Sequence, residues 1–233
     1  MGTPLYQTVI DTIISRIASG ELPSGALLPS ETQLGSDLGV SQGTARKALI
    51  ELEKRGLVQR AQGRGTFVTL RTPETSLFNF FRLRSRDGTL NVPQLVSETV
   101  TRRPATEDET ATLYGRPKEI IQIHRVRSVG GRRATHELSC LPPALYPGII
   151  DRVPLTNALY VLYQRAYSII IVRADERLRA VGAPPDVAEA LKVAPGTPMM
   201  RMRREAVDVL DRVVELRTCH LLTEEMDYFV SLS

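Results

Sequence analysis

The chain opens with apolar residues spaced as on one face of a helix. They recur every four residues from Leu5 to Ile17, and Gly20 follows them, which predicts an amphipathic helix. Thr3 can cap this helix, and Pro4 suits its first turn because proline there loses no hydrogen bond. We therefore expect one helix before the first turn-rich segment.

Two further short helices are predicted directly after that segment. Ser30 and Gln33 form a capping-box pattern, so the second helix begins at Ser30 and ends near Gly39. Ser41 can cap a third helix, whose apolar positions follow i, i+3, i+4, i+7 spacing: Ala45, Ala48, Leu49 and Leu52. Two short helices joined by a tight turn containing glycine are typical of a helix-turn-helix.

A β-hairpin is predicted directly after the third helix, which Gly56 ends. Residues 57–60 and 66–69 have strand character, and residues 62–65 form the tip between them. Glycines on both sides of Arg64 let the backbone approach a phosphate or the minor groove closely. The hairpin and the three helices together predict a winged helix-turn-helix.

The rest of the chain alternates extended and helical patterns. Expected strands cover 94–102, 118–129, 134–141, 168–180, 198–209, 212–222 and 226–232. Expected helices begin at the Thr106–Glu109 capping box, cover 156–166, and follow Pro184–Pro185. Hairpin-like turns at Gly130–Gly131 and Leu210–Asp211 indicate a largely antiparallel sheet, hence an α+β domain.

Length and composition fit two globular domains. A chain of 233 residues with 42% hydrophobic and 24% charged residues is neither a disordered chain nor a membrane protein. We expect two domains, over 1–70 and 94–233, with a linker and domain entry over 71–93. The aromatic run at 78–81 is either the edge of this second domain or part of its core. No secretory pattern opens the chain, so a cytoplasmic location is expected.

The charge of the chain is concentrated in one short segment. The whole chain carries +4, whereas residues 40–72 hold seven basic and two acidic residues, a local +5. Such a patch is typical of a phosphate-contacting surface, although a solvated helix face with a basic loop would look the same. With the apolar face of the third helix buried, Gln42, Gly43, Arg46 and Lys47 are exposed toward DNA. Arg46 suits a base contact, since guanidinium can bridge O6 and N7 of guanine.

One strand of the second domain carries arginines on a face that begins as core. Alternation puts Ile121, Ile123, Arg125 and Arg127 on the same side. Buried guanidinium groups need carboxylates or an anionic ligand as partners; the alternative is an exposed strand end.

Acidic and hydroxyl groups on other strands could join these arginines. Glu137 shares a face with Ser139, as Glu215 does with Arg217. A strict two-residue turn at Gly130–Gly131 would pair Arg125 with His136, whereas a three-residue bulged turn would pair it with Glu137. The pocket requires the second register.

No residue pattern indicates catalysis or a metal. His124, His136 and His220 lie on predicted strands without metal-ligand spacing, so we expect structural or pocket roles. Cys140 and Cys219 are too few for a disulfide framework, and we expect buried apolar roles, with a redox pair as the alternative. We expect no enzyme activity, cofactor or metal.

The N-terminal motifs Leu28-Pro29-Ser30-Glu31, Leu38-Gly39-Val40-Ser41 and Gly63-Arg64-Gly65-Thr66-Phe67-Val68 resemble the DNA-binding domain of the GntR family of bacterial regulators, over residues 4–69. The resemblance implies operator contacts at Thr32, Ser41, Gln42, Gly43, Thr44, Arg46, Gly63, Arg64 and Gly65; position on the third helix adds Lys47. Thr32 and Gln42 stand where this family often has arginine, which removes possible phosphate or guanine contacts.

The C-terminal part resembles the UTRA effector domain of the HutC subfamily, over about 75–233. The motifs that carry the resemblance include Arg125-x-Arg127, His136-Glu137-Leu138-Ser139, Ala158-Leu159-Tyr160 and Asp227-Tyr228-Phe229. It implies ligand positions at Arg125, Arg127, Glu137, Tyr160 and Glu215, to which we add Asn79, Ser139, Glu176 and Tyr228. Ala158 stands where serine is frequent, which removes one ligand hydroxyl.

The resemblance implies a one-component transcription regulator, with a DNA-binding domain over 1–70 and an effector-binding and dimerisation domain over 94–233. We expect a homodimer on a palindromic DNA operator, a repressor released by a small anionic effector, and no membrane partner. An activator is the alternative within this class. The UTRA fold is similar to chorismate lyase, so an enzyme is the alternative from another class, and a structural nucleoid-type binder is the third.

Overall fold

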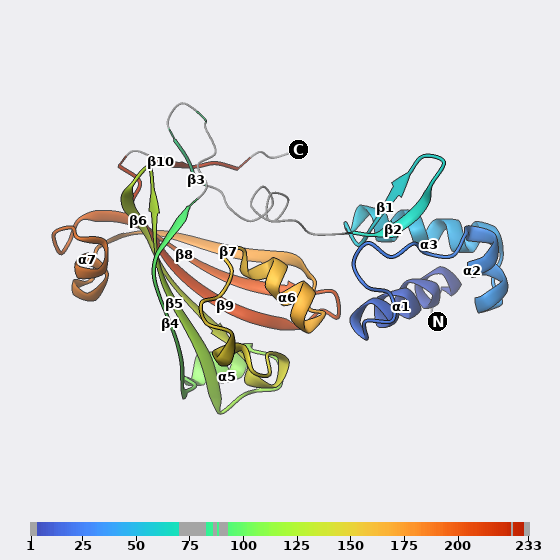
Figure 1. The fold of residues 1–233 in the computed structure, drawn as a ribbon, viewed down its shortest axis with the longest axis horizontal. Helices are drawn as coiled ribbons and strands as arrows, with labels where there is room; N and C mark the ends of the chain where they lie inside the picture. Colours follow the sequence, from blue (N-terminus) through green and yellow to red (C-terminus); the bar gives the residue numbers. More distant parts are fainter. Residues whose placement is uncertain (1–3, 70–82, 86–87, 89–92, 225, 231–233) are drawn as a thin grey trace. The chain divides into compact units, whose positions relative to one another are not determined.

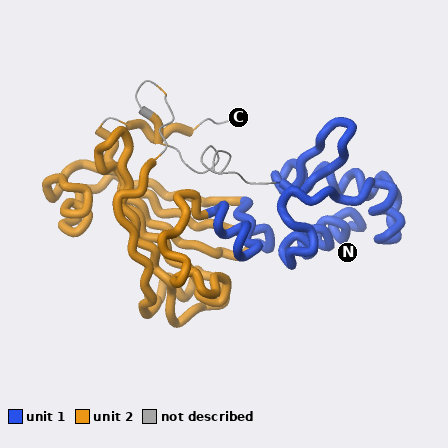
Figure 2. Tube along the Cα trace, viewed as in Figure 1, with its two compact units in different colours: residues 1–72, 160–172, 208–211 blue, residues 73–159, 173–207, 212–233 orange. Residues whose placement is uncertain are grey.

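The computed structural model describes residues 4–69, 83–85, 88, 93–224 and 226–230. The chain divides into two compact units (Figure 2). The first unit contains residues 1–72, 160–172 and 208–211, and the second contains residues 73–159, 173–207 and 212–233. Among the described helices, none is both long and apolar enough to cross a membrane.

Three helices begin the first unit: α1 (Leu5–Ala18), α2 (Glu31–Leu38) and α3 (Gln42–Lys54), as Figure 1 shows. Ser30 Oγ accepts from the Gln33 backbone N–H at 3.2 Å, and Ser41 Oγ accepts from that of Thr44 at 3.1 Å. These caps confirm the predicted helix starts. Half of the first capping box forms, because the Gln33 side chain donates to Asp37 Oδ1 at 2.6 Å instead. The α1 N-cap is Pro4, and the predicted cap Thr3 lies outside the described residues.

The hairpin follows as predicted. β1 (Val58–Ala61) pairs antiparallel with β2 (Gly65–Val68). The apolar faces of the three helices and the first and last residues of the hairpin close over one core, which contains Ile13, Leu34, Leu49, Val58 and Val68 among others, and in which Ile170 is also buried. The predicted winged helix-turn-helix is therefore present.

The rest of the chain is built around a six-stranded sheet with the strand order β4-β5-β6-β9-β8-β7 (Figure 1). Its strands are β4 (Gln94–Pro104), β5 (Glu119–Val129), β6 (Arg132–Leu141), β7 (Ile171–Gly182), β8 (Pro198–Asp208) and β9 (Val213–Leu221). The pairs β4-β5, β5-β6, β6-β9 and β9-β8 are antiparallel. The α+β class is confirmed.

Short helices and a two-stranded ribbon are the remaining elements; of these, all of α6 but its first residue belongs to the first unit. The helices are α5 (Glu107–Thr112), α6 (Leu159–Tyr167) and α7 (Pro185–Leu191), with 3-10 turns at Pro143–Leu145 and Ile149–Arg152. The ribbon pairs β3 (Leu83–Ser85) with β10 (Met226–Tyr228). β3 falls within the segment that we expected to be a linker. The aromatic run at 78–81 lies outside the described residues.

Three predicted boundaries are wrong, the first two for identifiable reasons. α6 begins at Leu159 rather than near residue 156, because Glu98 and Arg125 take up backbone groups of residues 155–157 that a helix would use. β7 begins at Ile171 rather than at 168, and Ser168 adopts a left-handed φ of 55° that interrupts a strand. β10 ends at Tyr228 rather than at 232.

The turn between β5 and β6 fixes which face Glu137 occupies. Val129 pairs with Arg132, and both glycines between them have positive φ (57° and 80°), so the turn has two residues. A bulge at Ala134 shifts the register, after which Arg125 pairs with Glu137. Of the two registers left open, the structure has the one that the pocket requires, but the extra residue lies in the strand rather than in the turn.

The register also separates the two cysteines. Cys219 pairs with Glu137, whereas Cys140 pairs with Leu216, so the two side chains lie on opposite faces of the sheet. Both thiols are buried and free, and burial raises the pKa of Cys140 to about 12. Their expected burial is confirmed, although Cys140 Sγ also accepts a hydrogen bond from Arg103 Nη2 at 3.5 Å, and the redox pair is wrong because the thiols lie on opposite faces.

Candidate functional site

A groove opens between the starts of α2 and α3 and the tip of the hairpin. Its lining comprises Leu27, Leu28, Pro29, Ser30, Glu31, Thr32, Gln42, Arg64, Gly65 and Thr66. Four residues predicted to contact DNA thus come together from three elements: Thr32, Gln42, Arg64 and Gly65. The groove therefore joins the starts of two helices to the hairpin tip.

The remaining predicted residues lie at the start of α3 and at the hairpin tip. Ser41 Oγ caps α3 and lies 2.9 Å from Thr44 Oγ1, so both hydroxyls are already engaged with each other. Lys47 Nζ lies 4.1 Å from the centre of the Tyr6 ring, a cation–π contact that draws it toward α1. A Cβ on Gly63 would meet no atom within 4 Å.

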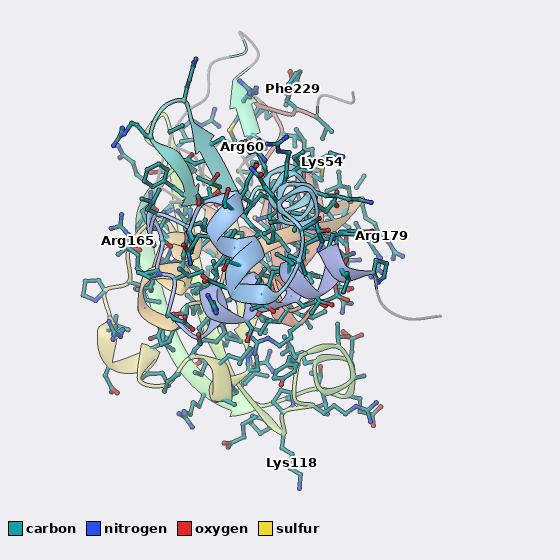
Figure 3. The ribbon with its side chains drawn as sticks, turned by 90° about the vertical axis from the view of Figure 1, so that its right-hand side faces the viewer. Lys54, Arg60, Lys118, Arg165, Arg179 and Phe229 are labelled. Atoms are coloured by element: carbon teal, nitrogen blue, oxygen red, sulfur yellow. The ribbon has the colours of Figure 1, made fainter. Side chains whose placement is uncertain are left out.

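Arg46 is held by a carboxylate that sequence reasoning missed. Its Nε donates to Glu31 Oε2 at 2.8 Å, and its side chain is 58% exposed. Glu31 also lies 3.5 Å from Nη2 of Arg60, which is labelled in Figure 3 and extends from β1. Arg60 in turn contacts Glu53 at 3.4 Å. These contacts link the starts of α2 and α3 to the hairpin. In the sequence, the one indication of this network was an acidic residue, Glu31, at the first position of α2.

Gly65 is the position where the hairpin tip tolerates a side chain least. Its φ of +108° is a conformation that residues with a Cβ rarely adopt, and a Cβ there would lie 2.8 Å from Leu27 Cδ1. We expect Gly65→Ala to destabilise the first unit by about 1–3 kcal/mol. Gly63→Ala is the matched control, since its φ is +71° and the space is open. Thermal unfolding of both variants tests this, and equal losses would contradict it.

Paired charges cover one face of the six-stranded sheet, which we call the arginine face. Arg125 is its most buried member, 1% exposed. Its Nε donates to Glu98 Oε2 at 2.6 Å, and its Nη1 and Nη2 donate to the carbonyls of Asn157 and Thr156 at 3.3 and 2.9 Å. Glu98 also accepts from the Leu155 backbone N–H at 2.8 Å. Arg125 therefore anchors the loop before α6.

Arg127 lies beside it with a similar set of partners. Its Nε donates to Glu137 Oε2 at 3.1 Å, its Nη1 donates to Asn157 Oδ1, and its Nη2 donates to the Asn157 carbonyl at 3.0 Å. Burial raises the pKa of Glu137, but the charges of Arg127 and Arg217 and a hydrogen bond from Thr135 outweigh it and lower that pKa. Glu137 is therefore an ionised, 7% exposed carboxylate.

Two more ion pairs continue this face across the sheet. Arg217 Nε donates to Ser139 Oγ at 3.0 Å, and its Nη2 donates to Glu215 Oε1 at 2.8 Å. Arg204, opposite Arg217 in the register, donates from Nε to Glu176 Oε1 at 2.6 Å. Arg125, Arg127, Arg217 and Arg204 are thus each paired with a glutamate on this face.

The structure brings together six of the nine predicted effector residues: Arg125, Arg127, Glu137, Ser139, Glu176 and Glu215. Tyr228 packs beside a buried cluster that includes Met202 and Cys219, whose register places them on the same face. Tyr160 belongs to the first unit, so its place at this site stays a prediction. Asn79 lies outside the described residues.

Four members of this face were not among the predicted residues: Glu98, Asn157, Arg204 and Arg217. Alternation along β4 could have put Glu98 on the arginine face, and Arg217 shares the face of Glu215 by spacing. Asn157 carries no such signal, because it lies in a loop.

The three histidines form a separate cluster on the opposite face, below α7. The rings of His124 and His136 lie 4.5 Å apart, and those of His136 and His220 lie 6.0 Å apart. Burial, and then the neighbouring histidines, lower the pKa of His136 to about 4; burial also lowers the pKa of His124 and of His220. Asp186 on α7 opposes these shifts, and Arg201 adds to that of His220.

This cluster predicts an acid-sensitive stability. Because the pKa of His136 is lower in the folded chain, the unfolded chain binds more protons, and stability falls as pH falls from about 6.5 to about 4. We expect His136→Gln to flatten that part of the profile. Melting temperatures of both proteins across this pH range measure the effect; parallel profiles would contradict it.

Comparison with known proteins accounts for both parts of the chain. The model of bacterial regulatory proteins of the gntR family matches residues 5–68, and the UTRA domain model matches residues 93–227. The chain belongs to the GntR family, with a C-terminal UTRA domain. Full-length similarity agrees: the transcriptional repressor NagR of Bacillus subtilis is 30% identical over 206 residues, covering 86% of this chain and 83% of NagR. The regulator SmoD of Agrobacterium fabrum is 29% identical, covering 86% and 84%.

Solved structures support the same assignment for this GntR regulator. The ligand-binding domain of a GntR-family regulator from Bordetella bronchiseptica matches with a TM-score of 0.61 and 27% identity, over 66% of this chain and 98% of that one. PhnF from Mycobacterium smegmatis, at 22% identity, shares the fold over 96% of this chain and 99% of its own, with a TM-score of 0.56. The chain is therefore a DNA-binding transcription regulator of the HutC type and not an enzyme.

Proposed function

We propose that this GntR regulator is a repressor whose operator affinity is controlled by a small anionic metabolite bound on the arginine face. The observation that carries the proposal is the Arg127 guanidinium, whose two Nη groups contact Asn157, a neutral residue on an exposed loop. A carboxylate or phosphate of the metabolite can form the same pair of hydrogen bonds with a full charge.

The relatives support this assignment. NagR is named a transcriptional repressor, and an Escherichia coli relative, MngR, 27% identical over 220 residues, is named the mannosyl-D-glycerate transport/metabolism system repressor. Glycerate is a carboxylate, which agrees with an acidic effector.

The DNA-binding side of the proposal rests on the head, by which we mean residues 4–69. We propose that Arg46 reads a guanine, that the groove beside Thr32, Gln42 and Arg64 holds the DNA backbone, and that two heads of a cytoplasmic homodimer bind a palindrome. The domains that we propose, 1–70 and 94–233 with a linker between them, agree with the ranges that the two family models match.

Thermal-shift measurements on the full chain test the effector. We expect acidic sugar derivatives and organic acids to raise the melting temperature, with a concentration dependence set by their affinity. Each compound that raises the melting temperature is then added to the complex of the protein with a DNA duplex, which is first selected by the protein from a pool of random sequences. Release of the duplex supports repression, tighter binding would identify an activator, and a response to neutral compounds alone would overturn the anionic effector.

A further inference from the structure

We propose that Asn157 competes with the effector for Arg127. In the free protein Asn157 contacts both Nη groups of Arg127, which we call the Arg127 fork, and an anionic effector must displace it. The inference rests on the proposed function, since it concerns the same arginine. Beyond the proposed function, it names the residue that sets the affinity for the effector and the segment that moves when the effector binds.

The contacts of Asn157 imitate those of a bound acid. Its side-chain oxygen accepts from Arg127 Nη1 and its carbonyl oxygen accepts from Nη2, so two oxygens meet the two terminal nitrogens, as those of a carboxylate or phosphate do. The Asn157 carbonyl also accepts from Arg125 Nη1 at 3.3 Å. Asn157 thus contacts both Nη groups of Arg127 and Nη1 of Arg125.

Asn157 is the partner that can be displaced. Glu98 and Glu137 are buried carboxylates paired with the Nε edges of the two arginines, and removing either would leave a buried charge unpaired. Asn157 is neutral and exposed, so its release leaves no buried charge behind and its polar groups can be hydrated. An anion in its place would put a full negative charge beside the two guanidinium groups that Asn157 now contacts.

Displacement has a direct structural consequence. Asn157 Nδ2 donates to the Pro93 carbonyl at 2.8 Å, which joins the loop to the residue before β4. One residue, Ala158, separates Asn157 from α6, and residues 160–172 of that segment belong to the compact unit that contains the head. An effector that releases Asn157 therefore frees the loop on which α6 is mounted.

Anion binding to three loop variants of the full chain tests the competitor, with inorganic phosphate and acetate as separate probes for the two acid types. We expect Asn157→Ala to bind at least one probe about tenfold more tightly than the natural chain, since a hydrogen bond to a charged group no longer has to be broken. Asn157→Asp should bind more weakly, because its carboxylate pairs with Arg127. Thr156→Ser is the matched control and should bind as the natural chain does, since it keeps the hydroxyl that donates to the Ala158 carbonyl at 3.3 Å and only the Thr156 carbonyl contacts Arg125.

Arg127→Lys, alone and combined with Asn157→Ala, locates the bound anion. Lysine keeps the charge but cannot form the two-nitrogen fork, so the gain from Asn157→Ala should vanish. If Arg127→Lys weakens binding while Asn157→Ala and Asn157→Asp change nothing, the site stands and the competitor is overturned. If Arg127→Lys has no effect in either background, the anion binds elsewhere, and the proposed site falls with the inference.

Hydrogen exchange provides a second readout that does not depend on affinity. Amides of residues 155–159 should exchange faster in Asn157→Ala, and also in the natural chain saturated with the probe, than in the free natural chain. Unchanged exchange in both would overturn the release of the loop.

Discussion

Arg127→Ala should lower the free energy of unfolding by about 3–5 kcal/mol, because it leaves the Glu137 carboxylate buried without its ionic partner. Glu137 is 7% exposed, and among the neighbouring charges that of Arg127 lowers the pKa of Glu137 most. Chemical denaturation of the full chain measures the change. The same variant should lose the response to any effector, because the fork is gone.

The double variant Arg127→Ala with Glu137→Gln separates the two effects. Neutralising Glu137 removes the unpaired charge, so we expect most of the lost stability to return while the effector response remains absent. A double variant as unstable as the single one would show that Arg127 acts through its contacts with Asn157 rather than through the ion pair. An effector response that survives in the double variant would remove Arg127 from the site.

The features that could be predicted from the sequence depend on neighbours along the chain. Ser30 and Ser41 cap helices through the backbone three residues later, so a local pattern is enough to find them. The inward direction of Arg125 and Arg127 follows from strand alternation in the same way. These short-range rules were sufficient for the winged helix-turn-helix and for the class of the second domain.

The partners of the arginines could not be predicted, because they are distant in sequence. Glu98 reaches Arg125 from 27 residues away and Asn157 reaches Arg127 from 30 residues away. Whether Glu137 meets Arg127 depends on the bulge at Ala134, which no turn residue announces. The start of α6 was misplaced for a related reason: its first predicted turn is held extended by Glu98 and Arg125.

Arg46→Ala should reduce binding to a selected duplex more than binding to random DNA. A bidentate arginine–guanine contact contributes about 1–3 kcal/mol of discrimination, and Glu31 holds Nε of Arg46 so that the Nη pair can make it. Fluorescence anisotropy with the selected duplex and with a scrambled duplex of equal length measures the two losses at one salt concentration.

Lys47→Ala is the matched control for Arg46→Ala, since it removes one positive charge from the adjacent position of the same helix. Its ammonium contacts Tyr6, so whatever it gives to DNA binding is electrostatic, and its loss should weaken both duplexes equally. Salt dependence distinguishes the roles further: both variants reduce the slope of affinity against salt, but only Arg46→Ala should also change the base preferred in selection. If the two variants lose specific and random binding in the same ratio, Arg46 contacts phosphate, and the base is read by another residue of the groove.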